Sequence, residues 1–257
     1  ASAEQFVYMS ASGIIGLALG DYFGYHSMAI LGVKQYSIFI TIAPGAALIF
    51  GNIVLGENID LIGVAGIVIS IAGMIWFLKI SEPESVEGVA KDKYGTVKKG
   101  VLFGILSGLI QGFHITLSKK GMIDGTHQLT PMYGTWIRIF AATVGYFLFT
   151  FAQGKLKRSV IDVIRHDTKH IPKAAYATVF GMVLSVILVM WSITLCKVAV
   201  AQTILSMMPI VAVPAAYILH KEKITLKAMA AAVVSILGVI VLIWREDIVV
   251  WMQLHLH

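Results

Sequence analysis

Charged residues and cysteines are scarce in this sequence. Asp, Glu, Lys and Arg together make up 13% of the 257 residues, whereas 58% are hydrophobic, and the mean hydropathy is +0.83. Soluble domains carry about 25% charged residues, so this composition excludes an ordinary water-soluble domain. The single cysteine, Cys196, excludes a disulfide framework and a Cys-rich zinc site within the chain. We therefore expect a multi-pass integral membrane protein, in a bacterial inner or plasma membrane.

The sequence also lacks the patterns of nucleic-acid binding and of enzyme sites. The net charge is +6, but no basic motif is interleaved with aromatic residues, and the cations lie between apolar runs. No pair of intramembrane carboxylates, no His/Glu metal spacing and no nucleophile with a base is present. We predict no nucleic-acid partner, no metal, no cofactor and no enzymatic activity. The first residues show neither a signal peptide nor a natural start.

Long apolar runs occupy most of the chain. A bilayer core about 30 Å thick needs roughly 20 apolar residues in a helix. Eight runs meet this requirement, near residues 6–31, 36–55, 60–80, 100–118, 131–152, 174–196, 199–219 and 224–244. Two longer linkers interrupt them at 81–99 and 153–173, and the second is expected to hold a short interfacial helix at 160–164. The predicted fold class is an all-α polytopic membrane helix bundle.

An internal repeat links the two ends of the chain. A shift of 165 residues lays spans one to three on spans six to eight, with Pro44 on Pro209 and Glu57 on Glu222. Spans four and five have no counterpart in the first half. We hypothesise ten spans in a full-length protein, five in each repeat, with the first two absent here. Because five is odd, the two repeats must be inverted relative to each other in the membrane.

The repeat sets the predicted domain organisation. Residues 1–80 form the last three helices of the first repeat, and 81–99 form the linker. Residues 100–245 form the five helices of the second repeat, and 246–257 form a tail.

Sequence motifs in both repeats are similar to a known family. The stretch SIFITIAPGAALIFGNIVLGE, followed by IVISIAGMI, has a second copy in QTILSMMPIVAVPAAYILHKE and VVSILGVIVLI. Together with the segment WIRIFAATVGYFLF, these stretches resemble the EamA-type ten-helix members of the drug/metabolite transporter superfamily. Lys221 replaces the glycine of the Gly-Glu hairpin in the second copy, and Pro214 is an extra proline there.

The resemblance implies a secondary transporter, often an exporter, that moves a small metabolite or amphipathic solute by alternating access. The same scaffold also suits a flippase of an amphipathic lipid or lipid-linked sugar, or a membrane subunit that does not transport. The sequence does not identify the substrate, the coupling ion or the oligomeric state. The expected partners are a small-molecule substrate and the lipid bilayer, with the proton as a candidate coupling ion.

Several residues inside the spans are candidates for function. Pro44 and Pro209 each remove one backbone hydrogen bond and are predicted to bend their helices. Glycines spaced by four residues predict close helix packing, or faces that slide during transport. They are Gly16, Gly20 and Gly24 in span one and Gly100, Gly104, Gly108 and Gly112 in span four.

Polar side chains at mid-membrane depth form the candidate site. Polar groups in a dry bundle need partners, so those of spans one and four either line an aqueous cavity or are satisfied by packing. They are Tyr22, Tyr25, His26, Gln111 and His114. Asp21 is the only carboxylate well inside a span and is expected to face the bundle interior, where it exchanges a proton, balances a cationic substrate, or forms a buried hydrogen bond. Arg138 either reaches the surface as an anchor or binds an anionic substrate group.

The carboxylates of the hairpins have a structural interpretation. Glu57 and Glu222 lie at helix junctions, where a negative charge favours the positive N-terminus of a helix.

The distribution of cations predicts the orientation. Fifteen Lys and Arg residues fall on the side with the 81–99 and 153–173 loops, against Lys119, Lys120, Lys197 and Arg245 on the other. The positive-inside rule then places the C-terminus outside, whereas the resemblance implies a cytoplasmic C-terminus.

Overall fold

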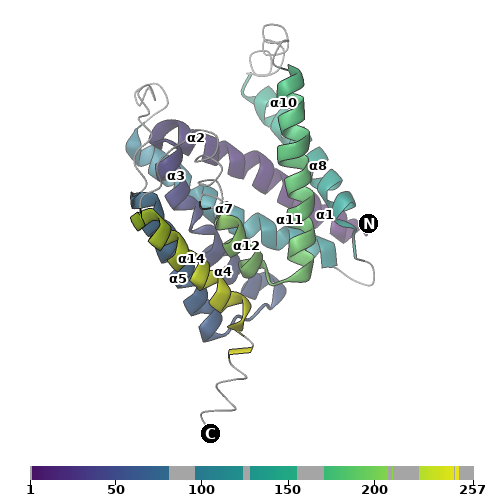
Figure 1. The fold of residues 1–257 in the computed structure, drawn as a ribbon. Coiled ribbons are helices and arrows are strands. Elements are labelled where there is room, and N and C mark those ends of the chain that lie inside the picture. Colours follow the sequence, from purple (N-terminus) through teal and green to yellow (C-terminus); the bar gives the residue numbers. More distant parts are fainter. Residues whose placement is uncertain are drawn as a thin grey trace. The chain divides into compact units, whose positions relative to one another are not determined.

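The computed structural model describes residues 2–80, 96–123, 128–154, 171–207, 210, 226–245 and 247–248. Within these ranges every regular element is a helix, as predicted (Figure 1). The helices of the first half are α1 (Ala3–Gly13), η1 (Ile14–Gly20), α2 (Asp21–Leu31), α3 (Val33–Ile40), α4 (Ala43–Leu55) and α5 (Leu61–Ile80). Those of the second half are α7 (Val97–Ile123), α8 (Pro131–Ala152), α10 (Ile171–Ala177), η3 (Thr178–Val183), α11 (Leu184–Leu195), α12 (Val198–Ser206) and α14 (Leu226–Ile243).

Seven of the eight predicted spans are found in the described residues as helices long and apolar enough to cross a membrane. The predicted span at 199–219 begins with α12, and most of its remainder lies outside the described residues, as do the predicted helix at 160–164 and Glu222. The fourth span is longer than expected, because α7 has 27 residues and so extends about 40 Å. The protein is an integral multi-pass membrane protein.

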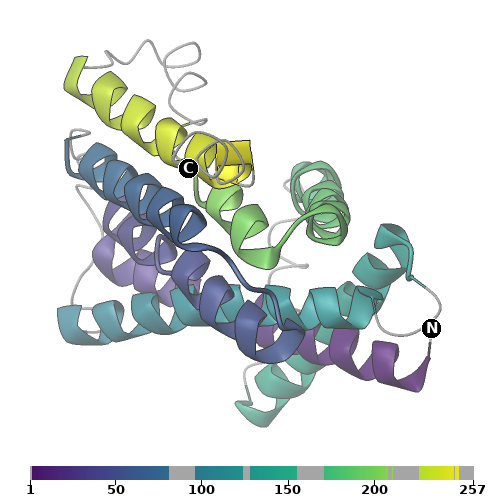
Figure 2. The ribbon, with the colours of Figure 1, turned by 90° about the horizontal axis from the view of Figure 1, so that it is seen from below.

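The chain divides into two compact units, and each contains segments of both predicted repeats. Unit 1 consists of Ala1–Asp21 and His114–Cys196, and unit 2 of Tyr22–Phe113 and Lys197–His257. In unit 1, α8 packs against α1, η1 and α11. In unit 2, α5 packs along α14, and α4 packs against α12. Both views of the ribbon show α5 and α14 side by side (Figures 1 and 2).

Helices α5 and α14 are equivalent under the 165-residue shift, and they cross where small residues meet. A methyl group added to Gly73 would lie 2.5 Å from the backbone nitrogen of Ser235, and one added to Gly238 would lie 2.4 Å from that of Ser70. The 165-residue shift converts each contact into the other, because Gly73 corresponds to Gly238 and Ser70 to Ser235. The hydroxyls of Ser70 and Ser235, which are themselves equivalent under the shift, lie 3.3 Å apart, and Ser235 donates to the Ser70 carbonyl at 2.9 Å.

The pairing also gives the direction of the two helices. Gly66, near the start of α5, contacts Leu242 near the end of α14, whereas Gly73, further along α5, contacts Ser235, which lies earlier in α14. The helices are therefore antiparallel. Reciprocal contacts between equivalent residues are the signature of a two-fold axis, here perpendicular to both helices. For spanning helices this axis lies in the membrane plane, so the inverted relation predicted from the repeat is present in this pair.

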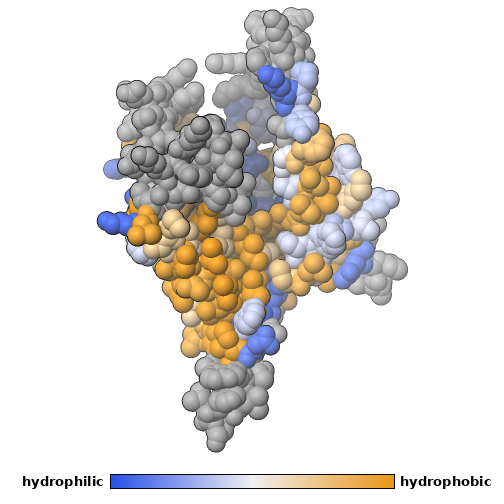
Figure 3. Space-filling view, viewed as in Figure 1, coloured by the Kyte–Doolittle hydropathy of each residue, from blue (hydrophilic) through white to orange (hydrophobic). Residues whose placement is uncertain are grey.

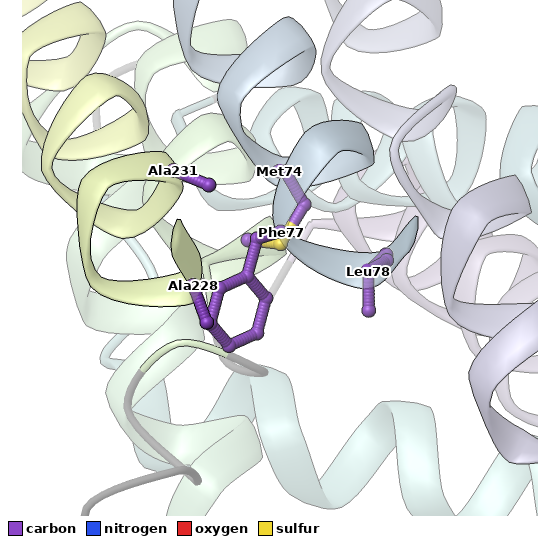
Figure 4. Close-up of a cluster of buried hydrophobic side chains, with 5 residues drawn as sticks. All are labelled: Met74, Phe77, Leu78, Ala228 and Ala231. Carbon is purple, nitrogen blue, oxygen red and sulfur yellow. The ribbon is translucent and has the colours of Figure 1, made fainter. Parts of the chain in front are cut away.

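The α5/α14 pair combines a small hydrophobic core with a large apolar surface. Met74, Phe77, Leu78, Ala228 and Ala231 form a buried cluster, in which the Phe77 ring extends toward Ala228 (Figure 4). Where Figure 1 places these helices, the space-filling view shows a continuous hydrophobic surface (Figure 3). Val68, Val233 and Leu237 are each more than half exposed. An apolar surface of this size suits contact with lipid rather than with water.

The glycines of span four are packing residues. An added methyl group would meet atoms of span one at Gly100, and atoms of span two at Gly104, Gly108 and Gly112, at less than 3 Å. Gly108, for example, would place its methyl group 2.5 Å from the carbonyl oxygen of Phe39. The packing interpretation of this glycine face is therefore confirmed within unit 2.

We expect Gly238→Ala to lower the stability of the protein, by about 1 to 3 kcal/mol as is typical for overpacking. The new methyl group meets the backbone of α5 rather than a movable side chain, so the helices must separate. Gly45→Ala is the control, because a methyl group there meets nothing within 4 Å. Thermal unfolding of the purified variants measures the difference, and equal transitions for G238A and G45A would contradict the packing.

Candidate functional site

The regular α-helix of the second span is interrupted at Thr41 and Ile42, whose backbone stays in the right-handed helical conformation. Helix α3 ends at Ile40 and α4 begins at Ala43, so Pro44 lies in the first turn of α4, where its missing N–H needs no partner. At this interruption, the Thr41 hydroxyl donates to the Ile38 carbonyl at 2.6 Å.

The end of α12 in the other repeat shows the same local hydrogen bond. Helix α12 ends at Ser206, which is the equivalent of Thr41, and the Ser206 hydroxyl donates to the Thr203 carbonyl at 2.8 Å. Pro209 lies outside the described residues, so its predicted bend stays a prediction. Spans one and six also share a feature, because the wide π-helical turns of η1 and η3 overlap under the 165-residue shift. Such turns often occur at functional sites.

Arg138 lies at the centre of a polar cluster in unit 1. Its side chain is only 1% exposed, so the anchor that reaches the surface is not observed. One terminal guanidinium nitrogen donates to His114 Nδ1 at 3.0 Å, and the other donates to the Met190 sulfur at 3.3 Å. The buried Nε has no hydrogen-bond partner. The cation is therefore held by two uncharged side chains.

The contact with Arg138 determines the protonation of His114. A guanidinium can only donate, so Nδ1 of His114 must accept, and the imidazole must be neutral with its proton on Nε2. Gly16 provides the space for this ring, since a methyl group there would lie 2.4 Å from its Cγ. Gly13 provides the space for the backbone of Arg138, whose carbonyl oxygen would lie 2.4 Å from an added methyl group. Helix α1 and turn η1 thus approach this cluster closely because both positions are glycine.

Asp21 belongs to the same unit and lies at the junction of η1 and α2. It interacts electrostatically with Arg138, but among the described residues it forms no ion pair with Arg138 within 4 Å. The two opposite charges are therefore near each other without being joined.

The other candidates belong to unit 2. Nδ1 of His26 donates to the Tyr22 carbonyl at 2.8 Å, and the two rings lie 4.2 Å apart. Tyr25 is 67% exposed and does not join them. Gln111 is half-buried on α7. The predicted residues thus form two groups, with Asp21, His114 and Arg138 in unit 1 and Tyr22 with His26 in unit 2.

Met190 is the member of the cluster that sequence reasoning missed. It is completely buried, and its sulfur is a weak acceptor for a charged donor. No sequence signal marks it, because a methionine in an apolar span is typical of ordinary core packing. The glycines at 13 and 16 were the available signal, since they permit close approach to α8 and α7.

Comparison with protein families bears directly on this arrangement. The model of the EamA-like transporter family matches residues 2–79 and 98–244. The chain belongs to this family, and through it to the drug/metabolite transporter superfamily. The resemblance recognised in the sequence is confirmed, and the protein is a membrane transporter of this type. A comparison with curated proteins finds no match.

In this EamA-like protein, the Gly-Glu hairpin joins the two repeats. Gly56 ends α4 in the left-handed conformation, with φ of 66°, which glycine adopts without strain. The next residue, Glu57, accepts a hydrogen bond from the backbone N–H of Val198 at 2.7 Å. The predicted helix-terminus role is therefore found at α12 rather than at α5, the next helix in the chain. Lys197 adds a second link by donating to the Asn58 carbonyl at 2.6 Å.

We expect Glu57→Gln to lower the free energy of unfolding by about 1 kcal/mol, the usual value of a helix-terminus carboxylate. The variant keeps an oxygen acceptor but loses the charge opposite the N-terminus of α12, which has no other side-chain cap. Glu4→Gln is the matched control, because Glu4 is exposed and α1 already has a capping box of Ser2 and Gln5. Chemical unfolding in detergent measures both, and a Glu57→Gln loss no larger than the control would contradict the cap.

The four cations on the less basic side all make local contacts. Lys119 donates to the Cys196 carbonyl at 2.6 Å, and Lys120 lies 5.2 Å from the centre of the Tyr8 ring. Arg245 lies 3.3 Å from the Asp60 carboxylate. With Lys197 on Asn58, each of these cations contributes to packing. The predicted orientation of the chain stays a prediction.

Proposed function

We propose that the protein is a secondary transporter that moves a small metabolite or amphipathic solute by alternating access, as an exporter in a bacterial inner membrane. The observation that carries this proposal is that the junction of α3 with α4 and the end of α12 have the same local hydrogen bonds at equivalent positions of the two repeats, at Thr41 and Ser206. In inverted-repeat transporters, substrates bind where discontinuous helices of the two halves meet. The direction of export rests on the resemblance to the family.

The physical argument concerns which parts move. Helices α5 and α14 are joined by backbone contacts along their length, so they form a rigid pair. At Thr41 and Ser206 the backbone bonds shorten to three-residue spacing, with Ile42 N–H on the Phe39 carbonyl and Met207 N–H on the Ile204 carbonyl, both at 3.1 Å. The Thr41 and Ser206 hydroxyls donate to the carbonyls that lose their usual donor. Because the two repeats are equivalent, exchanging their local conformations produces a second state of similar energy. That exchange is the basis of alternating access.

The experiment begins with purified protein and a panel of amino acids, nucleobases, sugars and amphipathic cations. A ligand that binds the folded state raises its unfolding temperature. The compounds that do so are then tested for flux in proteoliposomes with a labelled form of the solute. Flux that requires the protein and saturates supports the proposal. Movement of a fluorescent lipid without flux of any solute would overturn it.

A variant tests the role of the junction of α3 and α4. We expect Pro44→Ala to slow transport by about tenfold, equivalent to 1.4 kcal/mol, because α3 and α4 can then join into a stiffer helix. Pro131→Ala is the control, since Pro131 also lies in the first turn of its helix, α8, with no break before it in the same span. If P44A transports at the same rate as P131A, the junction of α3 and α4 does not have the proposed role in transport.

A further inference from the structure

Two buried arginines in this protein have opposite surroundings. Arg245 is 7% exposed. It has the Asp60 carboxylate at 3.3 Å and donates to the Leu242 carbonyl at 2.9 Å. Arg138 is 1% exposed and has no carboxylate within 4 Å among the described residues. Its charge is therefore compensated only from a distance, by Asp21.

The contacts of Arg138 leave it ready for an anion. A buried charge is costly unless it is paired and hydrogen-bonded. A neutral imidazole and a thioether supply no negative charge, and the thioether is only a weak acceptor. The Nε–H of each arginine has no hydrogen-bond partner, but only that of Arg245 has a carboxylate within 4 Å among the described residues. A carboxylate accepts two parallel hydrogen bonds from a guanidinium. The free Nε–H of Arg138 lies on the same edge of the guanidinium as Nη2, the nitrogen that donates to His114, so a carboxylate can accept from Nε–H and from an N–H of Nη2.

The same surroundings limit the charge of the ligand. Asp21 is close enough to interact with Arg138, so an anion bound to Arg138 experiences its repulsion. A phosphate carries nearly two negative charges at neutral pH and is repelled more strongly than a carboxylate. The site therefore favours a monoanionic carboxylate.

We propose that Arg138, held by His114 and Met190, binds the carboxylate group of the transported solute. This inference rests on the proposed transport function, because Arg138 is closed to solvent in this structure and a solute reaches it only when the bundle opens. The neutral His114 and the soft Met190 sulfur hold the guanidinium in place between transport cycles and release it to the carboxylate.

The first test uses the wild-type protein and matched pairs of small compounds. Thermal unfolding is measured with acetate and acetamide, isobutyrate and isobutyramide, and benzoate and benzamide, and with inorganic phosphate, at constant ionic strength. We expect at least one carboxylate to raise the unfolding temperature while its neutral amide does not. Equal shifts with the amides, a larger shift with phosphate, or no shift with any carboxylate would overturn the proposal.

The second test uses variants of the two buried arginines. We expect Arg138→Gln to weaken the apparent affinity for the active carboxylate by about tenfold or more, and Arg138→Lys to retain part of it, because the charge remains. Arg245→Gln removes a buried positive charge elsewhere and should leave the affinity unchanged. If Arg138 had only a structural role, R138Q and R245Q would have the same apparent affinity for the carboxylate, and the proposal would be wrong. If R138Q does not fold, the affinity of R138K and the carboxylate and amide pairs measured on the wild-type protein test the proposal instead.

Flux measurements separate this proposal from the proposed function. Carboxylate binding that depends on Arg138, without flux of any solute, would support the binding site but contradict the proposed transport function. Flux of a neutral solute that carboxylates do not inhibit would keep the transporter and overturn the site.

Discussion

Replacing Gly13 by alanine should destabilise unit 1 by about 3 kcal/mol, at the upper end of overpacking costs. The added methyl group would lie 2.4 Å from the carbonyl oxygen and 2.9 Å from the Cα of Arg138. Both are backbone atoms, so no side-chain rotation relieves the clash, and α1 must move away from α8. This movement should also separate Arg138 from His114. Thermal unfolding measures the first effect, and loss of carboxylate stabilisation measures the second.

Gly181→Ala is the control for this prediction. Gly181 lies in the same unit, within η3, and an added methyl group there meets nothing within 4 Å. Alanine is usually the better helix residue, so this variant should be as stable as the wild type or more stable. A G13A protein that unfolds at the temperature of G181A would show that α1 and α8 do not pack as the structure describes.

Asp21→Asn is expected to slow transport by about tenfold or more, equivalent to at least 1.4 kcal/mol, and to remove its dependence on pH. Asparagine preserves the shape of the side chain but neither binds a proton nor carries a charge, and an ionisable group inside a span usually has such a function. Arg138 is the charged group that interacts with Asp21. Proteoliposome flux measured over a range of internal and external pH tests the prediction.

Asp60→Asn serves as the comparison for Asp21→Asn. Asp60 is also a carboxylate, but it precedes α5 and is paired with Arg245, so its loss should reduce stability without changing the pH dependence. If D21N protein transports at the wild-type rate with the same pH dependence, the coupling role is wrong. A lower stability with unchanged transport per folded molecule would make Asp21 a structural residue.

The site itself was only partly predictable. Asp21, His114 and Arg138 were selected because polar groups inside apolar runs need a reason to be there. Their grouping was not predicted, and neither was the separation of Tyr22 and His26 into the other unit. Met190 carries no polar signal in the sequence, and its role depends on the direction in which Arg138 points. The surface anchor considered for Arg138 required an exposed side chain, and the structure shows a buried one.

The sequence by itself determined the membrane class, the positions of seven spans and the relation between the repeats. Each of these depends on composition, on the length of an apolar run, or on the comparison of two stretches of chain. The tertiary structure alone decided which residues meet: Ser70 with Ser235, Glu57 with the N-terminus of α12, and Arg138 with His114 and Met190. Helix formation is a local property of the backbone, whereas these contacts depend on how helices cross and where side chains point. A sequence pattern therefore identifies the helices, but only their packing shows that the buried charge of Arg138 has no anion beside it.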